Sequence, residues 1–185
     1  MSVILASQSP RRKELLAWLI PEFEVQPADV DEEIKPEHTP KGYVQEMARQ
    51  KSAVIAEKHP QDLVIASDTV VVLEDKILGK PKDRQEAYDM LAAMSGGSHV
   101  VYTAVVLRQG DKTEESLTSA TVTFYALSKE EIEGYLDTGD YKDKAGAYGI
   151  QHQAGVFVEK IEGDYYSIVG FPVGKVNQML KSFTF

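Results

Sequence analysis

The carboxylate of Asp68 lies inside a stretch that is otherwise apolar. Residues 63–66 and 70–73 are apolar, largely β-branched runs of the kind that form buried strands, and Ser67, Asp68 and Thr69 separate them. A carboxylate in such a place is costly to bury unless it is paired, hydrogen-bonded or bound to a metal ion. From the residues alone two interpretations stay open. Asp68 either caps a turn at a strand end, as aspartate often does, or belongs to a functional site.

Two arginines fall in the first turn of a predicted helix. Ser9 and Pro10 suit the N-cap and the first helical position, so Arg11 and Arg12 lie at the end whose dipole disfavours cations. This placement is favourable if an anion sits there, met by free backbone N–H groups and by the guanidinium groups. The alternative is that both side chains extend into water at a small electrostatic cost. The pair favours a phosphate site, although no glycine-rich loop accompanies it.

An acidic loop and two lysines supply further candidates. Residues 28–33 (ADVDEE) are either solvated surface or, through carboxylates such as that of Glu32, ligands of a hard divalent cation. Lys51 falls on the apolar face of a predicted helix over residues 40–58. Its ammonium either snorkels to the edge of that face, which is the favoured interpretation, or reaches an anion in a cleft. Lys80 follows a glycine at the end of a predicted return strand.

Together these cations and carboxylates suit metal-assisted attack of water on a phosphoanhydride. The cations would stabilise charge on the phosphates, a metal ion would bridge them, and a carboxylate would take the proton of the water. Covalent catalysis has little support, because the chain has no cysteine and no G-x-S-x-G motif. There is no Walker A or dinucleotide-binding motif, and the four histidines lack the spacing of metal ligands. The candidates are Arg11, Arg12, Glu32, Lys51, Asp68 and Lys80.

The elements that must position these residues alternate along the chain. The predicted order is β-α-β-α-β-β-α-β-β-α-loop-β-β-α, with a last hairpin over residues 155–161 and 165–169. Hairpins mixed with crossovers predict an α/β fold whose mixed sheet is flanked by helices, rather than a purely doubly wound sheet. Residues 141–151 are too rich in glycine for a helix and too polar for a buried strand. They form either an ordinary surface loop or a close approach to a ligand.

Composition limits the partners. The 185 residues are enough for one domain, which we expect to span residues 1–185. A net charge of −9 argues against non-specific binding to duplex nucleic acid or to an anionic membrane, which select a basic face. The absence of cysteine is compatible with a reducing cytoplasm. The first residues lack the charge order of a signal peptide, and no stretch approaches the length of a membrane span.

Five segments, taken in order, closely resemble the Maf family. They are residues 6–12 (ASQSPRR), 66–69 (ASDT), 79–81 (GKP), 143–151 (DKAGAYGIQ) and 163–170 (GDYYSIVG), and the resemblance covers essentially the whole chain. It implies a cytoplasmic nucleoside triphosphate pyrophosphatase that uses a divalent cation (magnesium, manganese or cobalt). It also implies an elongated, twisted mixed sheet with a deep cleft between two lobes, like that of inosine triphosphatases. Dimers are common in the family, so a homodimer is expected.

The resemblance also implies roles for the candidates around the phosphates. It identifies Asp68 as the proton acceptor and as a metal ligand, and it makes Glu32 the partner of Asp68 at the metal. Lys51 and Lys80 are expected near the phosphates, with Arg12 beside them at the helix start.

Three positions separate the subfamilies by substrate. Members that act on dTTP and UTP carry arginine, threonine and glutamine, and this chain has Arg11, Thr69 and Gln151. Members that act on 7-methyl-GTP carry tryptophan, glutamine and glutamate. The resemblance therefore implies the dTTP/UTP type, and the amide of Gln151 offers the donor and acceptor that suit the edge shared by thymine and uracil. His152 departs from the family, which usually has glycine there.

A function of another class stays open. The Maf family is also associated with inhibition of septum formation, so the chain could be a nucleotide-binding regulator whose hydrolysis is incidental. Binding without turnover would distinguish this regulator from the enzyme. A nucleic-acid-binding function is disfavoured by the net charge.

Overall fold

Three long antiparallel strands form the centre of a seven-stranded mixed sheet. The computed structural model describes all of residues 1–185. The strand order is β2-β1-β3-β5-β6-β7, and β4 pairs with β3. The short strands β1 and β2 are parallel, as are β1 and β3, and all other pairs are antiparallel. The strands are β1 (Val3–Leu5), β2 (Glu24–Val25), β3 (Leu63–Leu73), β4 (Lys76–Leu78), β5 (Ser98–Gln109), β6 (Lys112–Phe124) and β7 (Val158–Gly163).

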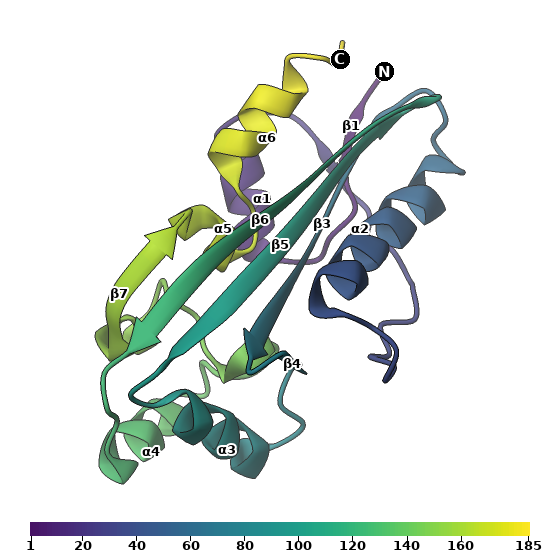
Figure 1. Cartoon of the computed structure of the whole chain (residues 1–185). Helices are drawn as coiled ribbons and strands as arrows, with labels where there is room; N and C mark the ends of the chain where they lie inside the picture. The colour runs from purple at the N-terminus through teal and green to yellow at the C-terminus, as the bar shows by residue number, and fades with distance from the viewer.

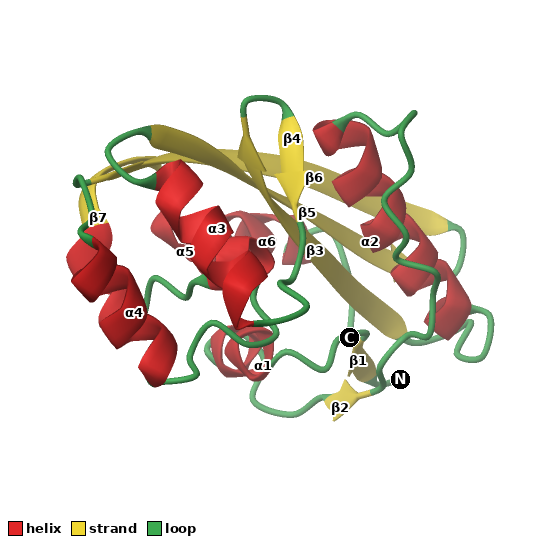
Figure 2. Cartoon of the chain, turned by 90° about the horizontal axis from the view of Figure 1, so that it is seen from below, coloured by secondary structure: helices red, strands yellow, loops and turns green.

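Helices cover both faces of this sheet (Figures 1 and 2). They are α1 (Pro10–Ala17), α2 (Pro40–Ala56), α3 (Arg84–Met94), α4 (Lys129–Asp137), α5 (Tyr165–Val169) and α6 (Val173–Leu180). Successive residues of β3 point to opposite faces of the sheet, as the two-residue period of a strand requires. Val70 and Val72 pack against α2, whereas Ile65 packs in the cluster of α1 and α6. Val71 packs with α3 and α4. The mixed sheet flanked by helices is thus confirmed.

The central strand differs from its prediction. Two strands with a polar interruption were expected, but β3 runs without a break through Ser67, Asp68 and Thr69, and Asp68 lies opposite Ala104 of β5. The interpretation of Asp68 as the cap of a turn is therefore wrong. The strand can continue because the ladder with β5 pairs one edge of its backbone and because all three polar side chains find partners: Ser67 at Gly170, Asp68 at Lys51 of α2 and Thr69 at Thr103 of β5.

The expected last hairpin is also wrong in its second arm. Residues 165–169 form the helix α5 and not a strand. Asp164 is the N-cap, since its side chain accepts a hydrogen bond from the backbone N–H of Tyr166 at 2.9 Å. Gly170 ends the helix in a left-handed conformation, with φ of 113°. Two strong end signals on a five-residue segment outweigh the β-propensity of its tyrosines, isoleucine and valine.

None of the helices combines the length and the apolar character that crossing a bilayer requires.

Candidate active site

A gap in the sheet exposes one edge of β3 at the predicted functional residues. On that edge β1 pairs with residues 63–65 of β3, and β4 pairs with residues 71–73. The edge between them, which includes Asp68 and Thr69, has no neighbouring strand. A cavity of about 900 Å³ opens at this gap. Its lining includes all eight residues singled out from the sequence: Arg11, Arg12, Glu32, Lys51, Asp68, Thr69, Lys80 and Gln151.

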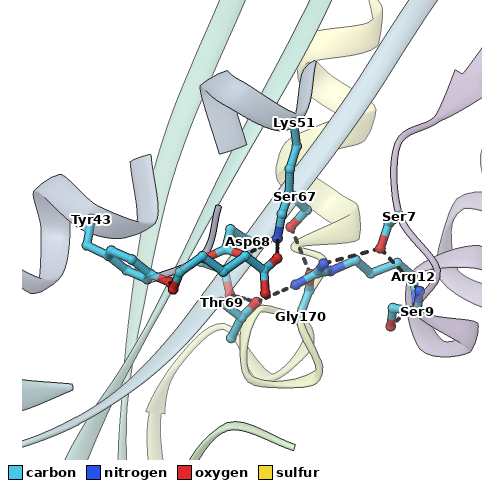
Figure 3. Close-up of polar contacts among 11 residues, drawn as sticks. Ser7, Ser9, Arg12, Tyr43, Lys51, Ser67, Asp68, Thr69 and Gly170 are labelled. Carbon is cyan, nitrogen blue, oxygen red and sulfur yellow. Dashed lines mark hydrogen bonds and ion pairs between the residues drawn. The ribbon is translucent and has the colours of Figure 1, made fainter. Parts of the chain in front are cut away.

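Lys51 joins two carboxylates from different segments. Its ammonium lies 2.8 Å from Oδ1 of Asp68 and 2.5 Å from Oε1 of Glu32. Figure 3 shows the lysine reaching from α2 to Asp68. Only 8% of Lys51 and 9% of Asp68 is exposed, so the favoured expectation that Lys51 snorkels to the edge of its helix is wrong. Lys51 instead reaches an anion in a cleft, which was the alternative interpretation. That anion is the pair of protein carboxylates, Asp68 and Glu32.

Burial and pairing act in opposite directions on the two carboxylates. Burial raises the pKa of Asp68, and the nearby Lys51 and Arg12 only partly oppose this effect. Burial also acts to raise the pKa of the half-exposed Glu32, but the hydrogen bond and charge of Lys51, with Lys80 and Arg12, outweigh it and lower the pKa. Asp68 is therefore the more basic carboxylate of the pair. Its second oxygen, Oδ2, accepts no hydrogen bond from the protein.

The loop that carries Glu32 is held by a residue that the sequence analysis did not single out. The hydroxyl of Tyr43, on α2, donates to the backbone carbonyl of Glu32 at 2.7 Å. Tyr43 lies on the buried face of α2, and a phenol on such a face is the signal that an oxygen needs a partner nearby.

Arg12 is fixed from three sides at the start of α1. Its guanidinium donates to the carbonyl of Gly170 at 2.9 Å, to the hydroxyl of Ser7 at 3.3 Å and to the hydroxyl of Thr69 at 3.1 Å (Figure 3). The predicted N-cap is confirmed, because Oγ of Ser9 accepts from the backbone N–H of Arg12. Burial lowers the pKa of Arg12, and the nearby charge of Asp68 opposes this effect. Because the ordinary pKa of arginine is far above neutral, Arg12 stays protonated.

Gly170 lies where a larger residue would disturb Arg12. A Cβ built on Gly170 would lie 3.3 Å from Oγ1 of Thr69 and 3.5 Å from Nε of Arg12. The left-handed backbone of Gly170 also disfavours any side chain. Glycine therefore lets the segment after α5 approach both residues closely.

The hydroxyl of Thr69 has a fixed direction. Thr103 donates its only hydroxyl proton to the carbonyl of Ser167 at 2.6 Å. The contact of 2.9 Å between the hydroxyls of Thr69 and Thr103 must therefore use the proton of Thr69. Thr69 also accepts from Arg12, which leaves one lone pair free. Toward a ligand in the cavity, Thr69 can act only as an acceptor.

The remaining predicted residues have few partners in the protein. No hydrogen bond or ion pair engages the side chains of Arg11 and Gln151, so both are available to a ligand. Lys80 lies 3.8 Å from the exposed carboxylate of Asp143. The segment with Gln151 is brought beside Lys80 by a backbone hydrogen bond of 3.1 Å from Gly146 to Gly79.

A divalent cation fits the carboxylate pair of this site. Glu32 and Asp68 already direct one oxygen each at a single cation, the ammonium of Lys51. Carboxylate oxygens are the ligands that magnesium and manganese prefer. No group of three or more histidine, cysteine, aspartate or glutamate residues has the arrangement of a metal site. A hard cation here would draw its other ligands from phosphate oxygens and water.

Comparisons with known proteins agree on the family of this chain. A family model described as Maf-like protein matches residues 2–183. A dTTP/UTP pyrophosphatase of Latilactobacillus sakei subsp. sakei (strain 23K) is 45% identical over 179 residues, which cover 97% of this chain and 99% of the relative. A protein of the same name from Bacillus cytotoxicus is 46% identical over 180 residues, which cover 97% of this chain and 94% of the relative.

Solved structures share the fold at much lower identity. The Ham1 protein of Staphylococcus aureus matches with a TM-score of 0.58 and 14% identity, and the match covers 98% of this chain and 99% of that chain. A HAM1 protein from Coxiella burnetii matches with a TM-score of 0.51 and 12% identity over 98% of both chains. The architecture expected from the sequence is therefore found in other proteins as well.

Proposed function

This chain belongs to the Maf family, and on that basis we propose that it is a nucleoside triphosphate pyrophosphatase acting on dTTP and UTP. Water attacks the α-phosphorus, the bond between the α- and β-phosphoryl groups breaks, and the products are the nucleoside monophosphate and pyrophosphate. The observation that carries the proposal is the buried, basic carboxylate of Asp68 among cations at one cavity. The names of relatives at 45% and 46% identity support the substrate assignment.

Asp68 is the proton acceptor in this proposal. Oδ1 is held by Lys51, whereas Oδ2 has no protein partner and can accept a proton from water. The raised pKa makes Asp68 a stronger base than an exposed aspartate. Lys51 orients the carboxylate while it keeps a positive charge close to the site of attack.

The cations around the gap bind the triphosphate. Arg11 and Arg12 stand at the N-terminus of α1, where backbone N–H groups and guanidinium groups both favour an anion. Lys51 and Lys80 line the same cavity. A divalent cation, held by Glu32 and Asp68, would when bound neutralise phosphate charge and polarise the anhydride.

The base is recognised by Thr69 and Gln151, with Arg11 beside them. Thymine and uracil both present an N3–H donor between two carbonyl groups, whereas cytosine presents an acceptor at N3. The acceptor that Thr69 has left suits a donor such as this N3–H. The unpartnered amide of Gln151 can donate to a carbonyl and accept from a donor.

The proposal extends to the setting of the enzyme. Because free nucleotides are the substrates, we place the protein in the cytoplasm. We propose that residues 1–185 act as one domain and that two copies form a homodimer, as the family resemblance implies.

The experiment is pyrophosphate release from dTTP, UTP, CTP, dGTP, ITP and 7-methyl-GTP, with magnesium or manganese. We expect turnover of dTTP and UTP, and loss of at least roughly 100-fold in the variant Asp68→Asn. Asp68→Asn keeps an oxygen for Lys51, so circular dichroism should show an intact fold. Near-normal turnover in this variant would remove Asp68 from the mechanism. Turnover centred on a purine nucleotide would overturn the roles of Arg11, Thr69 and Gln151. Binding of UTP without any turnover would favour the nucleotide-binding regulator.

A further inference from the structure

The loop that carries Gln151 has a polar support outside the cavity. We define the base loop as residues 144–152, of which Lys144, Ala145, Tyr148, Gly149, Ile150 and Gln151 line the cavity. Apart from a short turn of 3₁₀-helix at residues 145–147, the base loop has no regular structure. The position of Gln151 therefore depends on tertiary contacts that hold this loop, which are the backbone hydrogen bond from Gly146 to Gly79 and a set of side-chain contacts.

Asp140, in the turn after α4, contacts both ends of the base loop. At the start of the loop the ammonium of Lys144 lies 3.1 Å from Oδ1 of Asp140 and 2.5 Å from its backbone carbonyl. At the end of the loop Nδ1 of His152 lies 3.0 Å from the same Oδ1. One carboxylate thus connects two loop residues that are eight positions apart in the sequence.

The other oxygen of Asp140 is linked to the middle of the loop. Tyr135, on α4, donates its hydroxyl proton to Oδ2 at 3.1 Å. The same phenol oxygen accepts from the backbone N–H of Gly149 at 3.4 Å. A Cβ on Gly149 would lie 2.7 Å from Cε of Lys144, so the stem of this lysine passes directly against the loop backbone.

The negative charge of Asp140 suits it to holding the base loop. Burial acts to raise the pKa of Asp140, but hydrogen bonds from Lys144 and His152, the charge of Lys144 and the hydrogen bond from Tyr135 outweigh it and lower the pKa. The carboxylate is thus ionised at neutral pH. Its side chain is 18% exposed and that of Lys144 is 12% exposed, so water screens this pair less than a surface pair.

We propose that Asp140 is a positioning residue for base selection: through Lys144, Tyr135 and His152 it fixes the base loop so that Gln151 reaches the pyrimidine. Asp140 does not line the cavity, so we expect it to make no contact with the substrate. Its removal should therefore affect the recognition of the base and leave the triphosphate subsite at Arg12 and Lys51 unchanged. This inference rests on the proposed function.

The test compares Asp140→Ala with wild type and with Asp137→Ala. Asp137 is a matched control because its carboxylate lies three residues earlier and pairs only with the exposed Arg84. In Asp140→Ala we expect the KM for UTP to rise about tenfold with kcat within about twofold, and the preference for UTP over CTP to fall. Inhibition by inorganic triphosphate, which has no base, should not change. Asp137→Ala should behave as wild type in all of these assays.

Milder variants keep the proposal testable if Asp140→Ala fails to fold. Asp140→Asn keeps one oxygen, replaces the other with an NH2 group and loses the charge, and His152→Ala removes a single contact. We expect increases in KM that are smaller than in Asp140→Ala, with Asp140→Asn above His152→Ala. Amide hydrogen exchange adds a readout without turnover, and residues 144–152 should exchange faster in Asp140→Ala than in Asp137→Ala.

The outcomes separate this inference from the proposed function. If wild type turns over neither dTTP nor UTP, the proposed function fails, and hydrogen exchange with equilibrium binding of UTP then decides the role of Asp140. If wild type is active but Asp140→Ala keeps its KM and its preference for UTP, the role of Asp140 is wrong. Parallel loss of base preference and of triphosphate inhibition would also overturn it, because that pattern indicates general damage to the fold.

Discussion

Two aspartates in this protein are each held by a lysine, one inside the cavity and one behind a loop that lines it. Asp68 lies 2.8 Å from Lys51, and Asp140 lies 3.1 Å from Lys144. The pKa of Asp68 is nevertheless raised, whereas that of Asp140 is lowered. Burial is the largest influence on both, but only at Asp68 does it exceed the effect of the partners.

The difference comes from the depth of burial and from the number of partners, because Asp68 is the more deeply buried carboxylate and also accepts fewer hydrogen bonds. Asp140 accepts hydrogen bonds from Lys144, His152 and Tyr135, which use both of its oxygens. Asp68 accepts only from Lys51 and keeps Oδ2 free. A carboxylate whose oxygens are all engaged is a stable link between segments, while a buried carboxylate with a free oxygen is ready to take a proton. In the functions proposed above, the same Asp–Lys pair thus serves structure in one place and chemistry in the other.

The largest predicted loss of stability follows from removing Lys51, and removing Lys144 gives the comparison. Lys51→Met leaves Asp68 as a buried charge without its lysine, which should cost about 3–5 kcal/mol of unfolding free energy. Lys144→Met leaves Asp140 with His152 and Tyr135 and should cost only about 1–2 kcal/mol. Urea unfolding at neutral pH measures both free energies.

A double variant checks the cause of the larger loss. Asp68→Asn removes the buried charge, so Lys51→Met combined with Asp68→Asn should recover much of the stability lost in Lys51→Met alone. Equal losses in the two lysine variants would contradict the comparison between the aspartates. So would a double variant no more stable than Lys51→Met.

The proposed phosphate side of the cavity was more predictable from sequence than the proposed base side. Ser9 and Pro10 are local signals, and they place Arg11 and Arg12 at a helix start without any knowledge of the fold. Gln151 was predicted only from the resemblance to a family. Lys144 lies in one of the matching segments, but no role was predicted for it.

The contacts that join distant segments could not be predicted. The partners of Lys51 come from β3 and from the acidic loop, and no local pattern shows that these two segments meet. Asp140 stands in a turn, where aspartate is common, and only the packing of α4 against the base loop gives it three partners. Apolar alternation predicted β3 correctly on either side of Asp68, but periodicity does not show whether a polar residue breaks a strand or is paired within it.

Acid should lower the free energy of unfolding through His99, which contacts the base loop. Nε2 of His99 lies 2.6 Å from the hydroxyl of Tyr148 in the base loop, and Nδ1 has no partner. Burial lowers the pKa of His99 from 6.5 to about 4. Between these values the unfolded chain binds a proton that the native protein does not, so stability is lost as the pH falls from 6.5 toward 4. The full difference corresponds to about 3 kcal/mol.

Asp68 should respond to acid with the opposite sign. Its pKa in the native state is raised, so the native protein takes up this proton before the unfolded chain does, and acid relieves the cost of burying the charge. Unfolding free energies from pH 7 to pH 4 separate the two effects. His99→Gln keeps a partner for Tyr148 without the titration and should flatten the profile, whereas Asp68→Asn should steepen the loss. If His99→Gln has the same dependence of unfolding free energy on pH as wild type, His99 is not the source of the acid sensitivity.

The smallest effect should come from Thr103, which touches neither aspartate. Thr103→Val removes the acceptor for the proton of Thr69, while the carbonyl of Ser167 keeps its bond from the backbone N–H of Gly170. The loss of stability should be only about 1 kcal/mol. The freed hydroxyl of Thr69 can then donate as well as accept, so CTP should be rejected less strongly. We expect the ratio of kcat/KM for UTP to that for CTP to fall by roughly threefold to tenfold.

Thr118→Val is the matched control for this measurement. Thr118 lies opposite Thr103 in the sheet, and its hydroxyl bonds to the backbone carbonyl of Thr103 and not to the chain of hydroxyls. The ratio of UTP to CTP should stay at the wild-type value in this control. If Thr103→Val also keeps the wild-type ratio, the direction of the Thr69 hydroxyl does not select the base. Selection then rests on Gln151, and with it on the carboxylate of Asp140 that holds the base loop.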